Sequence, residues 1–149
     1  MQKNTITIRA AIPDDFTCVY TLIREFAVFQ KTPEKVSITP AVMLADKDLF
    51  KCLVAENVDG KIVGFATFFF AYYSWSGKAL YLDDLYVQQP YRQQHTGMSL
   101  LNEVIRYARD ADCKNIRWLV SSWNSKAIEF YKKLGAVTDE GQIICELKL

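Results

Sequence analysis

Apolar positions recur along this chain at the spacings of amphipathic helices. Residues 16–29 place large apolar side chains on one helical face after a proline and two aspartates, and 97–111 do so after a glycine. A third helix is predicted over 124–134, followed by Gly135 in the position of a C-terminal glycine cap. Thr39, with a proline after it, is typical of the start of a short helix.

Between the helical segments lie runs rich in branched and aromatic residues, as in β-strands. The strands expected are residues 5–9, 50–56, 61–73, 78–87, 115–120, 136–139 and 142–148. The last two would close the sheet as a hairpin about Glu140-Gly141. This order predicts an α/β (α+β) fold, with a mixed, mostly antiparallel sheet of about seven strands and helices on both faces.

Composition narrows the class of protein. The chain has 149 residues, half of them apolar, which is enough for one domain over 1–149 with a proper core. With 18 basic and 17 acidic residues the net charge is only +1, so no global field favours nucleic acid or a membrane surface. The most apolar stretch, 62–73, is too short to span a bilayer.

The cysteines and the single histidine limit the possible chemistry. The four cysteines show no CxxC pair and are expected to be reduced thiols, and His95 is the sole histidine, so no metal site is expected. The N-terminus lacks the apolar region of a signal peptide, and we expect a cytoplasmic protein. Acid–base chemistry must then come mainly from carboxylates, tyrosines or water.

The stretch 80–108 organises the rest of the chain. A strand with two adjacent carboxylates, Asp83 and Asp84, leads through a loop containing Arg92 and Gly97 into a helix. Such a loop directs backbone N–H groups and the positive end of a helix dipole at one point, which suits a phosphate. The GxxxxGK[ST] and GxGxxG motifs are absent. From the hexapeptide alone, an ordinary strand-to-helix connection is an equally good interpretation.

Two segments resemble landmarks of the GNAT superfamily of N-acetyltransferases. Residues 92–97, RQQHTG, resemble its Arg/Gln-x-x-Gly-x-Gly/Ala pyrophosphate loop, except that His95 replaces the first glycine. The segment SSWNSKAIEFYKKLGA resembles its Asn, Phe-Tyr and Gly-Ala block. Across nearly the whole chain the similarity is greatest to the spermidine/spermine and thialysine N-acetyltransferases, through LIREFA, KCLVAE, IVGFA, the Trp75-x-Gly77 turn and LYLDDLYV.

This resemblance implies transfer of an acetyl group from acetyl-CoA to a primary amine by direct attack. Backbone groups of the central strand would bind the pantetheine arm and polarise the thioester. The following loop would hold the pyrophosphate, with a charge-assisted contact from Arg92. The cofactor-binding residues implied are Leu85, Tyr86, Val87, Arg92, Gln93, Gln94, His95, Thr96, Gly97, Met98, Asn124, Lys126 and Tyr131.

The resemblance also implies the catalytic roles. Tyr131 would be the general acid, since a phenol with a pKa of ~10 stays protonated at neutral pH. Asp83 takes the place of a glutamate base and, being shorter, would act through a bridging water. Asp84 would attract the cationic substrate. Adjacent strand residues point to opposite faces, so without a bulge only one carboxylate could face the cleft. Tyr131 could instead be a core aromatic residue without a catalytic role. Asp83 and Asp84 could instead be solvated carboxylates at the end of a strand.

Departures from the relatives bear on the substrate. Gln30 and Tyr73 stand where the polyamine enzymes carry acidic residues. We still expect Gln30 to contact the substrate. Trp75, with Tyr72 or Tyr73, could hold one ammonium by cation–π contact. These changes favour a small amine, such as a diamine or a thialysine-like amino acid, over a long polycation.

The histidine in the loop leaves rival interpretations open. His95 would weaken cofactor binding, unless it contacts a phosphate itself. A degenerate domain that binds CoA without catalysis, as a sensor or interaction module, is therefore an alternative. A protein or peptide N-acetyltransferase is another. The relatives are commonly dimers, so the resemblance implies a homodimer. The sequence does not identify the amine.

Overall fold

The computed structural model describes residues 5–149, which form two compact units, one ending at Trp118 and one spanning Leu119–Leu149. The helices and strands of the first unit are β1 (Thr7–Ala10), α1 (Phe16–Phe29), α2 (Pro40–Ala45), β2 (Lys51–Glu56), β3 (Ile62–Tyr73), β4 (Gly77–Val87), α3 (Thr96–Asp110) and β5 (Ile116–Arg117). The second unit contains α4 (Ser125–Lys133). None of these helices is long and apolar enough to cross a bilayer.

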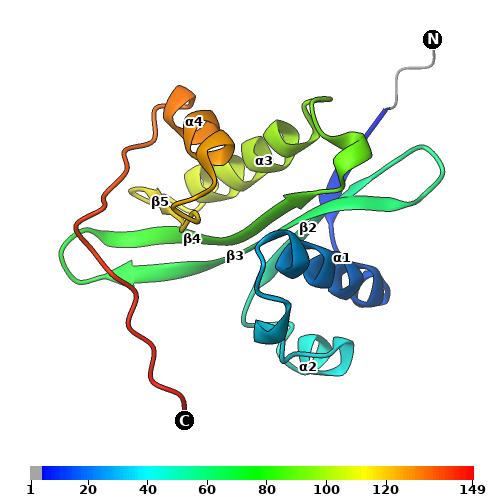
Figure 1. Ribbon diagram of the computed structural model, residues 1–149, viewed down its shortest axis with the longest axis horizontal. Coiled ribbons are helices and arrows are strands. Elements are labelled where there is room, and N and C mark those ends of the chain that lie inside the picture. Colours follow the sequence, from blue (N-terminus) through cyan, green and yellow to red (C-terminus); the bar gives the residue numbers. More distant parts are fainter. Residues whose placement is uncertain (1–4) are drawn as a thin grey trace. The chain divides into compact units, whose positions relative to one another are not determined.

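The sheet confirms the predicted class of fold. Its five strands lie in the order β1-β2-β3-β4-β5; neighbours pair antiparallel except β4 and β5, which are parallel. In Figure 1, α3 covers one face of this sheet and α1 covers the other. The sheet is therefore mixed and mostly antiparallel, with helices on both faces.

Each face of the sheet has its own apolar core. On one face, α3 buries Leu100, Leu101 and Val104 against a cluster that includes Leu80 and Leu82 of β4. On the other, α1 packs its apolar stripe against β2 and β3. The stripe is the one predicted by the helical spacing, so the sequence pattern and the packing agree. Burial of these apolar side chains is the main force that holds the helices to the sheet.

A β-bulge interrupts β4 at the two carboxylates. Thr67 pairs with Asp84 but the next residue of β3, Phe68, pairs with Leu82, so Asp83 is the extra residue. The bulge changes which side chains face α3: Leu82 does so before the bulge and Leu85 after it, although they are three positions apart. Both carboxylates lie between these two leucines and therefore point away from the α3 core.

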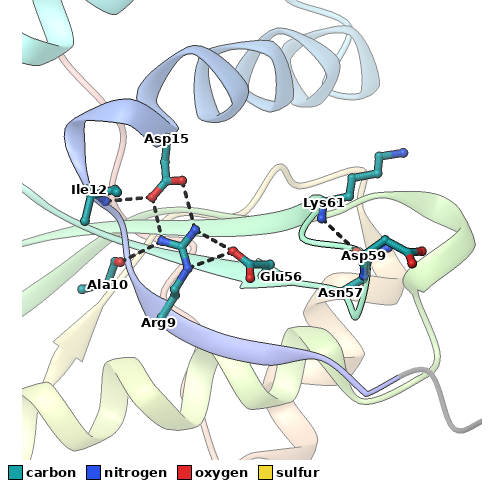
Figure 2. A network of polar contacts seen from close by, with 8 residues as sticks. All are labelled: Arg9, Ala10, Ile12, Asp15, Glu56, Asn57, Asp59 and Lys61. Atoms are coloured by element: carbon teal, nitrogen blue, oxygen red, sulfur yellow. Dashed lines mark hydrogen bonds and ion pairs between the residues drawn. The ribbon is translucent and has the colours of Figure 1, made fainter.

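An ion network joins β1, β2 and the start of α1 (Figure 2). The guanidinium of Arg9 donates to both carboxylate oxygens of Asp15, at 2.7 and 3.0 Å, and to Glu56 Oε2 at 2.6 Å. Asp15 Oδ2 also accepts the Ile12 N–H at 2.8 Å. Hydrogen bonds from Arg9 lower the pKa of Asp15, so this carboxylate is held charged. The network fixes where the chain leaves β1 and enters α1.

The second unit departs from the prediction at the C-terminus. The helix is confirmed: Asn124 caps it by accepting the Ala127 N–H at 3.3 Å, and Gly135 follows with φ +93°. Residues 136–139 and 142–148, expected to form a closing hairpin, contain no strand. β5 is also only two residues long, not 115–120. Alternating apolar residues fit an extended chain as well as a paired strand, so the pattern alone did not determine whether these segments pair.

Candidate active site

β4 continues beyond its parallel partner. Pairing with β5 is limited to Leu80 with Ile116 and Tyr81 with Arg117, whereas β4 runs on to Val87. Within residues 5–149, no strand pairs with that edge of β4 after Tyr81. An open strand edge offers N–H and C=O groups to an extended ligand that contains amides. This edge includes Leu85 to Val87, the backbone predicted to bind a pantetheine arm.

The two bulge carboxylates lie at the start of this open edge. Burial, followed by the charge of Asp83, raises the pKa of Asp84 to about 7. Burial also raises the pKa of Asp83, which keeps more contact with solvent. Neither carboxylate is paired with a cation in the described part of the chain. Two unpaired, partly desolvated acids form a group able to accept a proton near neutral pH.

The loop predicted to bind phosphate has an unusual backbone. Gln93 and His95 both adopt left-handed conformations, with φ of 62° and 64°. Non-glycine residues rarely adopt this conformation, although histidine tolerates it better than most. His95 thus takes a glycine-like backbone, and its side chain is exposed. Successive residues of alternating hand turn their N–H groups toward one point, as in an anion-binding nest.

The first turn of α3 contains a buried polar group that a ligand could satisfy. Thr96 is 2 % exposed, and its Oγ1 has no hydrogen-bond partner among the described residues. A buried hydroxyl without a partner destabilises a fold by about 1–3 kcal/mol unless a ligand or water satisfies it. The open β4 edge, the nest and this hydroxyl together fit the amide-rich arm and the diphosphate of acetyl-CoA. Gly97 and Met98 continue the same turn.

Arg92 is held in a defined position before the loop. Its Nε donates to the Val87 carbonyl at 2.7 Å, and its guanidinium lies over the rings of Phe29 and Tyr86, at 5.0 and 5.5 Å from the centroids. The side chain thereby ties the end of β4 to the last residue of α1. The predicted contact of Arg92 with phosphate remains a prediction, and Gln94 binds the Pro90 carbonyl through its own amide at 3.0 Å.

Sequence reasoning missed Glu25 as part of this region. Its carboxylate accepts hydrogen bonds from the Tyr86 hydroxyl at 3.3 Å and from Gln88 Nε2 at 3.1 Å. Burial, with the neighbouring Glu25, raises the pKa of Tyr86. The side chain comes from α1, and its partners are Tyr86 of β4 and Gln88 just after that strand, so no local pattern could have predicted the contact.

The predicted substrate-binding residues are not all brought together. Trp75 lies in the turn after β3, fully exposed, next to Gly77 at the start of β4. The β3 partners of Gly77 and Asp84 are six positions apart, about 20 Å along the strand. Gln30 lies outside the β-sheet, at the C-terminal cap of α1. Trp75 therefore does not share one small ligand with Asp84 within a single chain. The ring beside Asp83 is instead Tyr81, which stacks on Phe69 at 5.1 Å.

Three predicted residues belong to the second unit. Lys126 is exposed on α4, Asn124 is the N-cap of that helix, and Tyr131 packs edge-on against Phe130 at 5.4 Å. Burial raises the pKa of the Tyr131 phenol, so the hydroxyl is protonated at neutral pH. No group of three or more possible metal ligands gathers within residues 5–149.

Comparison with known proteins identifies relatives of this chain. Residues 16–136 match the model of the acetyltransferase (GNAT) family. The thialysine N-epsilon-acetyltransferase of Sus scrofa is 34% identical over 89% of this chain and 84% of that protein. The spermidine/spermine N(1)-acetyltransferase-like protein 1 of Homo sapiens is 36% identical over 87% of this chain and 20% of that protein.

Solved structures show the same fold at lower identity. An aminoglycoside acetyltransferase from an uncultured soil metagenomic sample, in complex with sisomicin, superposes with a TM-score of 0.78. The two sequences are 18% identical, and the match covers 97% of this chain and 96% of that one. At this identity the likeness shows the fold alone.

Proposed function

The chain belongs to the acetyltransferase (GNAT) family, and on that premise we propose that it acetylates the primary amine of a small molecule, using acetyl-CoA, by direct attack. The observation that carries this proposal is the bulge in β4. It turns both Asp83 and Asp84 away from the α3 core at the start of an open strand edge. The family uses acetyl-CoA, and the open edge and the loop before α3 suit its arm and diphosphate.

The carboxylate pair would supply the base. An alkyl ammonium is protonated at neutral pH and must lose a proton before its nitrogen can attack. Asp83 would take this proton through a bridging water, and Asp84, with a pKa of about 7, would share it. Coupled carboxylates titrate as a pair, so the proton belongs to the pair and not to either residue alone.

Tyr131 would supply the acid, a proposal that rests on the sequence motif of α4. The new C–N bond forms as the thioester C–S bond breaks, and the thiolate leaves with the proton of the phenol. A phenol whose pKa is raised by burial holds that proton until sulfur becomes basic enough to take it. No acyl-enzyme is needed, because the amine itself is the nucleophile.

The charged and uncharged residues at the predicted substrate positions bear on the size of the amine. Asp83 and Asp84 provide one cluster of negative charge, whereas Gln30 and Tyr73 are uncharged at the positions noted in the sequence. One ammonium site, without the acids that the polyamine enzymes carry at these two positions, favours a diamine or an amino acid with a side-chain amine over a long polyamine. The thialysine N-epsilon-acetyltransferases are similar over most of this chain, which supports the same choice.

Turnover with a panel of amines tests this function. Putrescine, spermidine, thialysine, lysine and a short peptide are each mixed with acetyl-CoA, and release of free CoA is measured. We expect turnover with the small amines and a loss of about 10²-fold or more in kcat for Tyr131→Phe. The matched control is Tyr107→Phe, on α3, whose ring packs against Phe68.

The outcomes separate the candidate functions. Protein that neither binds acetyl-CoA in a calorimetric titration nor releases CoA with any amine would be a degenerate member of the family. Turnover with the peptide alone would indicate a protein or peptide N-acetyltransferase. Full turnover by Tyr131→Phe would show that another group is the acid.

A further inference from the structure

An arginine that the proposed mechanism does not use lies on the same face as the carboxylate pair. Arg117, the last residue of β5, pairs in register with Tyr81 of β4. Their neighbours Leu80 and Ile116 belong to the α3 core, so Tyr81 and Arg117 point to the opposite face. Asp83 and Asp84 also point away from the α3 core. The face therefore carries both a negative and a positive group.

Arg117 is held by a ring and not by a carboxylate. Its guanidinium carbon lies 3.8 Å from the centroid of the Tyr73 ring. Within residues 5–149 it forms no ion pair, although Arg9 and Arg106 each bind two carboxylates. Stacking covers one face of the guanidinium and leaves its in-plane N–H groups directed outward. Those groups match a carboxylate in geometry and charge.

The distance between the two charged groups suits a short ligand. Asp83 is two residues after Tyr81, about 7 Å along the strand. The Arg117 side chain starts beside Tyr81 and runs the other way, toward Tyr73, which pairs with Gly77. The guanidinium and the carboxylates therefore lie on either side of Tyr81, and an amino acid with an extended side chain could span them. Between them lies the Phe69–Tyr81 stack, an apolar floor for an aliphatic chain. Burial, then the charges of Asp83 and Tyr73, raises the pKa of Tyr81.

We propose that Arg117, positioned by Tyr73, binds the carboxylate of an amino-acid substrate whose side-chain amine lies at Asp83 and Asp84. This inference rests on the proposed function and makes Arg117 a specificity-determining residue. A carboxylate at this position gains a charge-assisted contact. The far ammonium of a diamine or polyamine would instead meet a like charge, so the same residue disfavours those substrates.

Matched substrate pairs that differ only in the carboxylate test the proposal. The pairs are L-ornithine with putrescine and L-lysine with cadaverine. We expect the wild type to prefer the amino acid in each pair, and Arg117→Gln to lose about 10- to 100-fold in kcat/KM for the amino acids alone. The control is Arg109→Gln, which removes one exposed positive charge from α3 and should leave the preference unchanged.

Tyr73 provides the test of positioning. Tyr73→Phe keeps the ring and should keep the preference, whereas Tyr73→Ala should lose most of it without a change in kcat for the diamines. An equal loss for both members of a pair in Arg117→Gln, or a change confined to the KM for acetyl-CoA, would overturn the proposal.

A binding measurement separates this inference from the proposed function. Calorimetric titration of the same pairs reads the preference without turnover. If the wild type binds L-ornithine no more tightly than putrescine, the role of Arg117 is wrong even when acetylation occurs. If the preference is present and is lost in Arg117→Gln, the role stands, and absence of acetyl transfer would then count against the proposed function alone.

Discussion

Two groups of acidic side chains in the first unit differ in almost every electrostatic respect. Asp15 and Glu56 surround Arg9, and hydrogen bonds from that guanidinium lower the pKa of Asp15. Among the described residues neither Asp83 nor Asp84 forms an ion pair, and burial raises the pKa of Asp84 to about 7. Since Asp15 is itself only 8 % exposed, burial alone does not explain the contrast. The presence or absence of a hydrogen-bonded cation does.

This contrast separates acids that stabilise the fold from acids that are available for chemistry. A carboxylate held by two hydrogen bonds from an arginine stays charged over the physiological range and cannot exchange protons there. A carboxylate that is desolvated and unpaired titrates near neutral pH at some cost in stability. Substituting each group in turn should therefore affect different quantities.

The largest effect is expected from removing the unpaired pair. Asp83→Asn combined with Asp84→Asn should lower kcat/KM by about 10³-fold, because the ammonium then has no carboxylate to take its proton. In the wild type, kcat/KM should rise with pH through about 7, where Asp84 becomes deprotonated. The measurement is the pH profile of CoA release for the wild type, the two single variants and the double variant.

Asp48→Asn is the matched control for that series, since Asp48 is an exposed carboxylate after α2. It should leave both the rate and the profile unchanged. If the double variant turned over at the wild-type rate with the same pH profile, the base would have to be sought elsewhere.

The second-largest effect is expected in the free energy of unfolding. Asp15→Asn leaves Arg9 with one carboxylate partner and should lower the free energy of unfolding by about 3 kcal/mol at pH 7. The pKa of Asp15 is lowered on folding, so its contribution is present above the unfolded value of 3.8 and is lost as pH falls below it. Urea unfolding at pH 7 and pH 3 measures both parts of this prediction.

Asp110→Asn, in the exposed pair with Arg106, provides the comparison and should change the free energy of unfolding far less, because solvent screens an exposed ion pair. The folded Asp15→Asn protein should acetylate amines at the wild-type rate. A stability loss no larger than that of Asp110→Asn would remove the distinction between the two groups of acids.

Much of the fold follows from local pattern. The helical spacing predicted α1 and α3 to within a residue or two, because an amphipathic stripe must face a core wherever the helix packs. The closing hairpin was wrong because alternating apolar residues fit an unpaired extended segment as well as a strand, and the pattern does not determine pairing. For the same reason the length of β5 was overestimated, since its pairing ends at Arg117.

The candidate site was predictable in its residues but not in its geometry. Asp83 and Asp84 are evident in the sequence, but the bulge that puts both on one side depends on how β3 and β4 align. The stack of Arg117 on Tyr73 likewise joins β5 to β3 across β4, and no spacing within either strand reveals it. The weaker cofactor binding predicted from His95 stays a prediction, and the structure adds only that its backbone adopts a left-handed conformation, which favours glycine.

The smallest predicted effect is a change in the free energy of unfolding whose sign differs between Asp84→Asn and Asp15→Asn. The pKa of Asp84 is raised on folding from 3.8 to about 7, so its protonated form is the one that the fold favours. The contribution of protonated Asp84 to stability is fully present below 3.8, the pKa of this group in the unfolded chain, and is lost as pH rises through 7. Asp84→Asn cannot ionise, so at pH 8 it should be more stable than the wild type, by about 2 kcal/mol after allowance for solvent screening.

Urea unfolding of the wild type and Asp84→Asn at pH 4 and pH 8 measures this gain, which should vanish at pH 4. Asp15→Asn must then show the opposite sign at pH 8, a loss where Asp84→Asn gains. A loss in both variants would mean that Asp84 is held by a partner as Asp15 is, and that it is not free to act as the base.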